Sequence, residues 1–101
     1  MDALKMPDLT GQNAIIFAAT SSDMGLFLAE TFAKCGANVA LSSRHEQKLI
    51  DSCAALKEAT GKEFRYYLSD AIDTADVEAT VKRANDEMGK ISIIVNLKAQ
   101  K

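Results

Sequence analysis

Short apolar runs alternate with segments of helical periodicity along the chain, and this alternation constrains the fold more than any other feature of the sequence. Four runs have the apolar character of strands in a sheet, namely 14–19, 39–41, 64–68 and 91–95. The segments between them repeat apolar residues at helical spacing and end near Gly36, Gly61 and Gly89. This βαβαβαβ order predicts an α/β fold with a parallel sheet, right-handed crossovers and helices on both faces.

Local signals predict where two helices begin and which strand lies at an edge. Ser43 and Glu46 have the spacing of a capping box at the start of the second helix, and Thr74 is the expected cap of the third. Arg65 favours an edge position for the strand 64–68, because a charged side chain there discourages further pairing.

Composition predicts a single folded domain over residues 1–101. The chain is 48% hydrophobic and 26% charged, which is typical of globular proteins. Its net charge is −2 and its basic residues are dispersed, so we expect neither nucleic acid nor an anionic membrane as a partner. The sequence has no apolar run of about 18 residues and no signal-peptide pattern at its start. We therefore expect an intracellular protein that is located in the cytoplasm.

The turn 20–25 is the predicted ligand site. Ligands of open parallel sheets bind beyond the carboxyl ends of the strands, where the strand order reverses. This turn follows the first strand and opens the first helix. The free amides and the partial positive charge of a helix start attract phosphate, so the turn is expected to bind a phosphate group.

At this turn the chain resembles the short-chain dehydrogenase/reductase family. The family motif Thr-Gly-x-x-x-Gly-x-Gly falls on residues 18–25, and residues 29–39 resemble the family's first helix and second strand. Asp70 matches an aspartate that lies against the adenine in this family. Asn96 matches the opening of its Asn-Asn-Ala-Gly motif. The resemblance extends over residues 9–96.

The resemblance implies a Rossmann-like sheet of four parallel strands in the order 3-2-1-4, incomplete relative to the full family fold. It also implies a dinucleotide ligand. Because Arg44 stands where NADP-preferring members carry a basic residue for the 2′-phosphate, NADP(H) is the expected cofactor. The cofactor-binding residues carried over from the family are Ala19, Ser21, Ser22, Asp23, Met24, Gly25, Ser43, Arg44, Asp70 and Asn96.

The phosphate turn departs from the family motif at two positions. Ala19 and Asp23 replace the first two glycines, and only Gly25 remains. A methyl group at Ala19 is compatible with the turn if φ is negative. The carboxylate of Asp23 would repel a phosphate about 4 Å away by about 4 kcal/mol at an effective dielectric near 20. We expect weak cofactor binding if Asp23 turns away to cap the helix, and the alternative is that the turn binds nothing.

The catalytic residues that the resemblance implies are a Ser and a Tyr-x-x-x-Lys beyond the fourth strand. Neither Tyr66 nor Tyr67 is followed by Lys at the fourth position, and residues 97–101 replace the rest of the family pattern. We therefore expect a truncated relative of NADP(H)-dependent enzymes that act on carbonyl or alcohol substrates. It would keep at most a weak dinucleotide site, with no catalytic turnover and no metal site.

Two other functions are consistent with the sequence. The strand 91–95 would lie at an open apolar edge, so the chain could be a non-catalytic interaction module that pairs with itself or with a full-length relative. The second is a Rossmann-like domain for another phosphate ligand, with Ser21 and Ser22 as hydrogen-bond donors.

Overall fold

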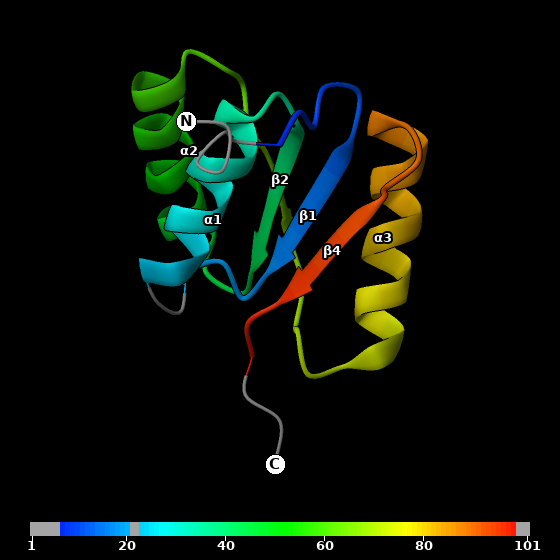
Figure 1. Ribbon diagram of the computed structural model, residues 1–101. Helices are drawn as coiled ribbons and strands as arrows, with labels where there is room; N and C mark the ends of the chain where they lie inside the picture. The colour runs from blue at the N-terminus through cyan, green and yellow to red at the C-terminus, as the bar shows by residue number, and fades with distance from the viewer. Residues whose placement is uncertain (1–6, 21–22, 99–101) are drawn as a thin grey trace.

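The computed structural model describes residues 7–20 and 23–98, which form a parallel sheet with helices on both faces (Figure 1). The strands are β1 (Asn13–Phe17), β2 (Asn38–Ser43), β3 (Arg65–Leu68) and β4 (Ile93–Asn96), and the helices are α1 (Asp23–Lys34), α2 (Glu46–Thr60) and α3 (Thr74–Met88). The sheet order is β3-β2-β1-β4, and every neighbouring pair is parallel. The predicted fold class, element order and strand order are confirmed.

The central strand β1 supplies side chains to two separate cores. Alternate residues of a strand point to opposite faces of the sheet. Ala14 and Ile16 pack in the cluster beneath α1 and α2, whereas Ile15 and Phe17 pack in the cluster beneath α3. In Figure 1, α1 and α2 accordingly cover one face and α3 covers the other. β1 is thus buried on both faces along its whole length.

The capping box predicted for the second helix is wrong. α2 begins after His45 without a side-chain cap. The Ser43 hydroxyl accepts a hydrogen bond from the amide of His45 at 3.1 Å, two residues along the chain. The Glu46 carboxylate accepts from the Tyr66 hydroxyl at 3.1 Å instead of turning back to the helix start. Ser43 thus forms a local turn, and Glu46 connects α2 to β3.

The cap predicted for the third helix is displaced by one residue. Asp73, not Thr74, precedes α3, and its carboxylate accepts from the amide of Asp76 at 3.2 Å. A carboxylate is also favoured at this end by the positive pole of the helix dipole. Thr74 is the first residue of the helix.

Both outer strands lie at sheet edges, and β4 is shorter than the predicted run 91–95. β3 pairs with β2 alone and begins at the exposed Arg65, which confirms the predicted edge position. β4 pairs with β1 alone. Ile94, the neighbour of Ile15 in register, is 54% exposed, as an open apolar edge predicts. Ile91 was expected on that edge as well, but it precedes the strand and is buried in the cluster beneath α3.

None of the helices in the described part of the chain is long and apolar enough to cross a bilayer.

Candidate functional site

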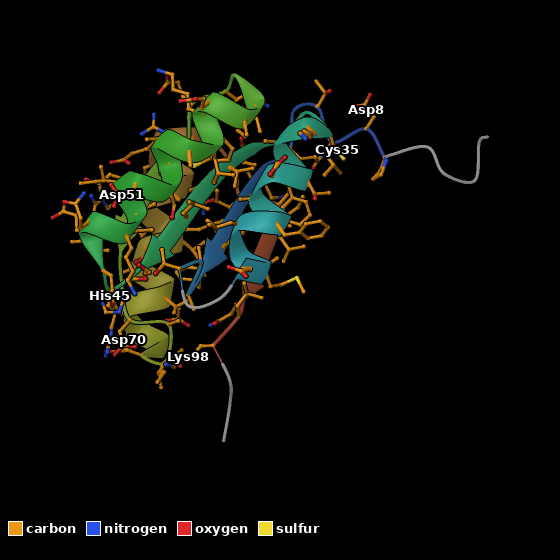
Figure 2. The ribbon with its side chains drawn as sticks, turned by 90° about the vertical axis from the view of Figure 1, so that its left-hand side faces the viewer. Asp8, Cys35, His45, Asp51, Asp70 and Lys98 are labelled. Atoms are coloured by element: carbon orange, nitrogen blue, oxygen red, sulfur yellow. The ribbon has the colours of Figure 1, made fainter. Side chains whose placement is uncertain are left out.

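A cavity of about 170 Å³ opens beyond the carboxyl ends of the strands, at the edge of the sheet where the sequence predicts a ligand. His45, Asp70 and Lys98 are seen together at this end of the molecule in Figure 2. The residues that line the cavity are Ala18, Thr20, Ser43, Arg44, His45, Lys48, Ser69, Asp70, Ala71 and Lys98.

The turn after β1 is attached to β2 and packs closely against α1. Ala18 takes a left-handed φ of 59°. The amide of Ala19 donates to the Ser42 carbonyl at 3.0 Å, and its methyl group is fully buried. Ala19 is not among the described residues that have a positive φ. Its methyl group is therefore compatible with this position, where the family motif has glycine. A Cβ at Gly25 would overlap the carbonyl of Ala19, so this close approach requires glycine.

Among the described residues of the predicted phosphate turn, Asp23, Met24 and Gly25 do not line the cavity. Ser21 and Ser22 lie outside the described residues. Asp23 is the first residue of α1 and Met24 the second, and both are exposed. Asp23 therefore stands in the first turn of the helix, where its carboxylate is stabilised by the helix dipole.

The ends of β2 and β3 are joined by hydrogen bonds beneath the cavity. The amide of Ser69 donates to the Ser43 carbonyl at 3.0 Å. The hydroxyl groups of Ser42 and Ser69 are 2.6 Å apart and buried. This rigid base presents the Arg44 side chain at the cavity wall, where 64% of it is exposed to solvent.

Asp70 is held at the cavity rim by hydrogen bonds and an ion pair. Its carboxylate accepts from the amide of Ile72 at 3.0 Å and lies 3.8 Å from the Arg44 guanidinium. Its own amide donates to the Asp76 carboxylate at 2.7 Å. Because both Arg44 and Asp70 are substantially exposed, their ion pair contributes at most about 1 kcal/mol, and a more highly charged anion would compete for Arg44.

Asn96 supports the cavity without lining it. Its side-chain amide donates to the Ala71 carbonyl at 3.1 Å, and its side-chain oxygen accepts from the Lys98 amide at 2.9 Å. The residue therefore ties the end of β4 to the loop between β3 and α3, and it fixes the backbone that carries Lys98.

Three residues of the cavity wall, His45, Lys48 and Lys98, were not predicted as site residues. His45 is exposed and lines the cavity. Lys48 follows Arg44 by four residues, and this one-turn spacing at the start of a helix is a signal that could have identified it. Lys98 lies beyond the last matched motif residue, and no pattern in the sequence pointed to it.

Both tyrosines lie away from the cavity wall. The Tyr67 hydroxyl donates to Glu87 at 2.7 Å, and burial followed by this hydrogen bond raises the pKa of the phenol. The hydrogen bond from Tyr66 to Glu46 raises the pKa of Tyr66. Both phenols are therefore protonated at neutral pH and bonded to other elements of the fold. Within the described residues, no group of three or more His, Cys, Asp or Glu side chains could hold a metal ion.

Comparisons with curated proteins identify a family. A profile of the family described as short chain dehydrogenase matches residues 12–98. The ketoacyl reductase HetN of Nostoc sp. is 33% identical over 91 residues, which cover 90% of this chain and 31% of HetN. The oxidoreductase UcpA of Escherichia coli K12 is 37% identical over 93 residues, covering 90% of this chain and 34% of UcpA. The chain thus spans about a third of the length of these relatives.

Solved structures agree with these matches. The L-sorbose reductase of Gluconobacter frateurii, solved with NADPH and L-sorbose, has a TM-score of 0.81 and 30% identity, over 96% of this chain and 36% of the reductase. The 2-keto-3-deoxy-D-gluconate dehydrogenase of Streptococcus agalactiae has a TM-score of 0.83 and 25% identity, over 99% of this chain and 37% of the enzyme. From the sheet order, the position of the cavity and the match over residues 12–98, the chain belongs to the short-chain dehydrogenase family.

Proposed function

We propose that the chain binds NADP(H) in the cavity at the carboxyl ends of the strands, as the cofactor-binding part of a family that oxidises alcohols and reduces carbonyl compounds. The observation that carries this proposal is the cavity wall after β2, where Arg44 and Lys48 stand beside Asp70. An arginine at this position accommodates a 2′-phosphate, whereas a carboxylate would bind a free 2′-hydroxyl. The NADPH in the similar L-sorbose reductase supports the choice of cofactor.

The residues present fit this group. Arg44 and Lys48 would hold the 2′-phosphate, and Asp70 at the rim would lie beside the adenosine. Ala18 and Thr20 line the cavity shortly before the positive end of α1, where a pyrophosphate is favoured. The exposed Asp23 carboxylate opposes that pyrophosphate, so the affinity is expected to be lower than that of a glycine-rich turn.

We do not expect this polypeptide alone to catalyse hydride transfer. The nicotinamide ring supplies the hydride when the cofactor is bound, but reduction of a carbonyl also needs a group that gives its oxygen a proton. In the described structure Tyr66 and Tyr67 are engaged by Glu46 and Glu87, away from the cavity wall. We therefore propose cofactor binding without turnover for these 101 residues.

The test is a titration of the 101-residue chain with NADPH and with NADH, followed by NADPH fluorescence and by calorimetry. We expect saturable binding of NADPH. Arg44→Ala should weaken NADPH binding by roughly ten- to a hundredfold, because a charge-assisted hydrogen bond contributes about 1.5–3 kcal/mol, and should leave NADH nearly unchanged. Arg83→Ala is the matched control, since Arg83 is equally exposed but lies over the Tyr67 ring.

Absence of NADPH binding at millimolar concentration would contradict the proposal. Equal effects of Arg44→Ala and Arg83→Ala would refute the assignment of the 2′-phosphate. The same samples, supplied with a panel of aldehydes and ketones, should consume no NADPH, and consumption above that of a buffer blank would refute the absence of turnover.

A second candidate function is an interaction module, and one observation favours it. β4 has a neighbour on one side only, and Ile94 on its α3 face is 54% exposed. An apolar edge strand is a template for pairing with another chain. Self-association through β4 is compatible with a cofactor cavity at the end of the sheet.

A further inference from the structure

The charge of the cavity wall is opposite to that of the chain. Three permanent cations line the cavity, Arg44, Lys48 and Lys98, against the single carboxylate of Asp70. With His45 neutral the wall carries +2, whereas the whole chain carries −2. This concentration of positive charge at one end of an acidic protein indicates an anionic ligand with more than one charge.

Lys98 approaches the cavity from the opposite side to the other two cations. Arg44 and Lys48 follow β2, and Lys98 follows β4. Because β2 and β4 flank β1 in the sheet, these two groups of cations stand on either side of the turn after β1. One phosphate group held by Arg44 would leave Lys98 to face a second phosphate across that turn.

Two hydrogen bonds hold the backbone that leads into Lys98. The amide of Leu97 donates to the Phe17 carbonyl at 3.1 Å, and the amide of Lys98 donates to the Asn96 side chain. Asn96 is in turn bonded to Ala71 across the cavity base. Among the described residues no carboxylate lies within ion-pair distance of the Lys98 ammonium, so this charge is available to a ligand.

The position of Lys98 is also one where this chain departs from its family. Counting from Asn96, the Asn-Asn-Ala-Gly motif has alanine at Lys98. The same chain carries Asp23 in place of a glycine at the pyrophosphate turn. Asp23 and Lys98 have opposite charges. Asp23 begins α1, the helix that follows β1, and Lys98 follows β4, which is the neighbour of β1 in the sheet.

We infer that Lys98 is a phosphate-binding residue of this chain, which contacts the pyrophosphate of the dinucleotide and offsets the charge of Asp23. The inference rests on the proposed function. Lys98 shares the cavity wall with Ala18 and Thr20, from which the chain runs to the start of α1. The pyrophosphate is common to NADPH and NADH, whereas the 2′-phosphate belongs to NADPH alone. Lys98 should therefore be needed for binding of both nucleotides, whereas Arg44 should be needed for NADPH alone.

The experiment compares Lys98→Ala, Lys98→Arg and Arg44→Ala in titrations with NADPH and with NADH. Lys90→Ala is the matched control, because it removes the same charge at the opposite end of β4, beside Asn13. Loss of one charge-assisted contact should weaken binding about tenfold. We expect Lys98→Ala to weaken both nucleotides by this factor, Lys98→Arg to retain most of the affinity, and Lys90→Ala to retain all of it. Thermal unfolding of each variant verifies that the fold is intact.

The outcomes separate this inference from the proposed function. If the unaltered chain binds neither nucleotide, both fail. If it binds NADPH and Lys98→Ala behaves like Lys90→Ala, the role of Lys98 is refuted while the cofactor site stands. If Lys98→Ala weakens NADPH but not NADH, Lys98 contacts the 2′-phosphate and the pyrophosphate assignment is wrong.

Discussion

Ala18 is the residue at which the local conformation conflicts most directly with the amino acid present. Its φ of 59° lies in the left-handed region, which costs an L-residue with a Cβ roughly 1–2 kcal/mol. Glycine removes that cost but adds about 0.5–1 kcal/mol of chain entropy in the unfolded state. Ala18→Gly also removes the methyl group of a residue that is only 7% exposed, so it should change the free energy of unfolding by less than about 1 kcal/mol, measured by urea denaturation.

The neighbouring Ala19 provides the control. Ala19 is fully buried and is outside the described positive-φ residues, so Ala19→Gly gains no relief of strain and loses a buried methyl group. It should lower the free energy of unfolding. A destabilising Ala18→Gly, similar in size to Ala19→Gly, would show that the left-handed turn is not strained in solution.

Residues whose roles follow from a motif could be predicted from the sequence, and residues placed by the path of the chain could not. Arg44 and Asp70 follow strand ends, so their positions at the cavity result directly from the order of elements. Lys48 lies at the cavity because α2 turns back over the end of β2. Lys98 lies there because Asn96 fixes the chain after β4. Both depend on geometry that no spacing in the sequence specifies.

At the scale of elements, the strands were predicted better than the helix starts. β1 and nearly all of β2 appear as buried runs because burial on both faces selects such residues, whereas the edge strands β3 and β4 are only partly buried. At the start of α3 two polar residues compete for the capping position. Asp73 and Thr74 are both residue types that cap helices, and in the structure Asp73 occupies the capping position. At α2 the Ser43 hydroxyl bonds an amide two residues away, which leaves the helix start without a side-chain cap.

The edge strand β4 carries a prediction of its own. An exposed Ile94 on a strand with one free side should drive association of the chain at micromolar concentration. Light scattering after size-exclusion chromatography should then give a mass above the 10.9 kDa of one chain. Ile94→Lys places a charge at this edge and should shift the population to the monomer.

The other edge of the sheet supplies the control for β4. Leu68 is 49% exposed at the end of β3, which already begins with the charged Arg65. Leu68→Lys should leave the association unchanged. A monomer for the unaltered chain, or an equal effect of the two lysine substitutions, would refute self-association through β4.

At the scale of the whole molecule, the described structure concentrates its chemistry at one end of the sheet. The opposite ends of the strands have a second hollow, lined by Glu63, Arg65 and Glu87 among others, where cations and carboxylates are mixed. Arg65 lies 3.6 Å from Glu87 there, and Tyr67 and Arg83 also contact Glu87, so these groups join β3 to α3. The two ends thus differ in charge: among the described residues, Lys48 and Lys98 line the cavity at the carboxyl end without an ion pair, whereas no lysine lines the second hollow.

Because the two ends of the sheet differ in charge, NADPH should bind at the carboxyl ends of the strands and not at the opposite ends. Amide chemical shifts of the ¹⁵N-labelled chain, recorded by NMR during addition of NADPH, report which end of the sheet meets the ligand. We expect saturable shifts at Thr20, Arg44, Asp70 and Lys98, with the amides of Glu63 and Glu87 unchanged. The absence of any shift at millimolar NADPH, or shifts centred on Glu63 and Glu87, would contradict a cofactor site at the carboxyl ends of the strands.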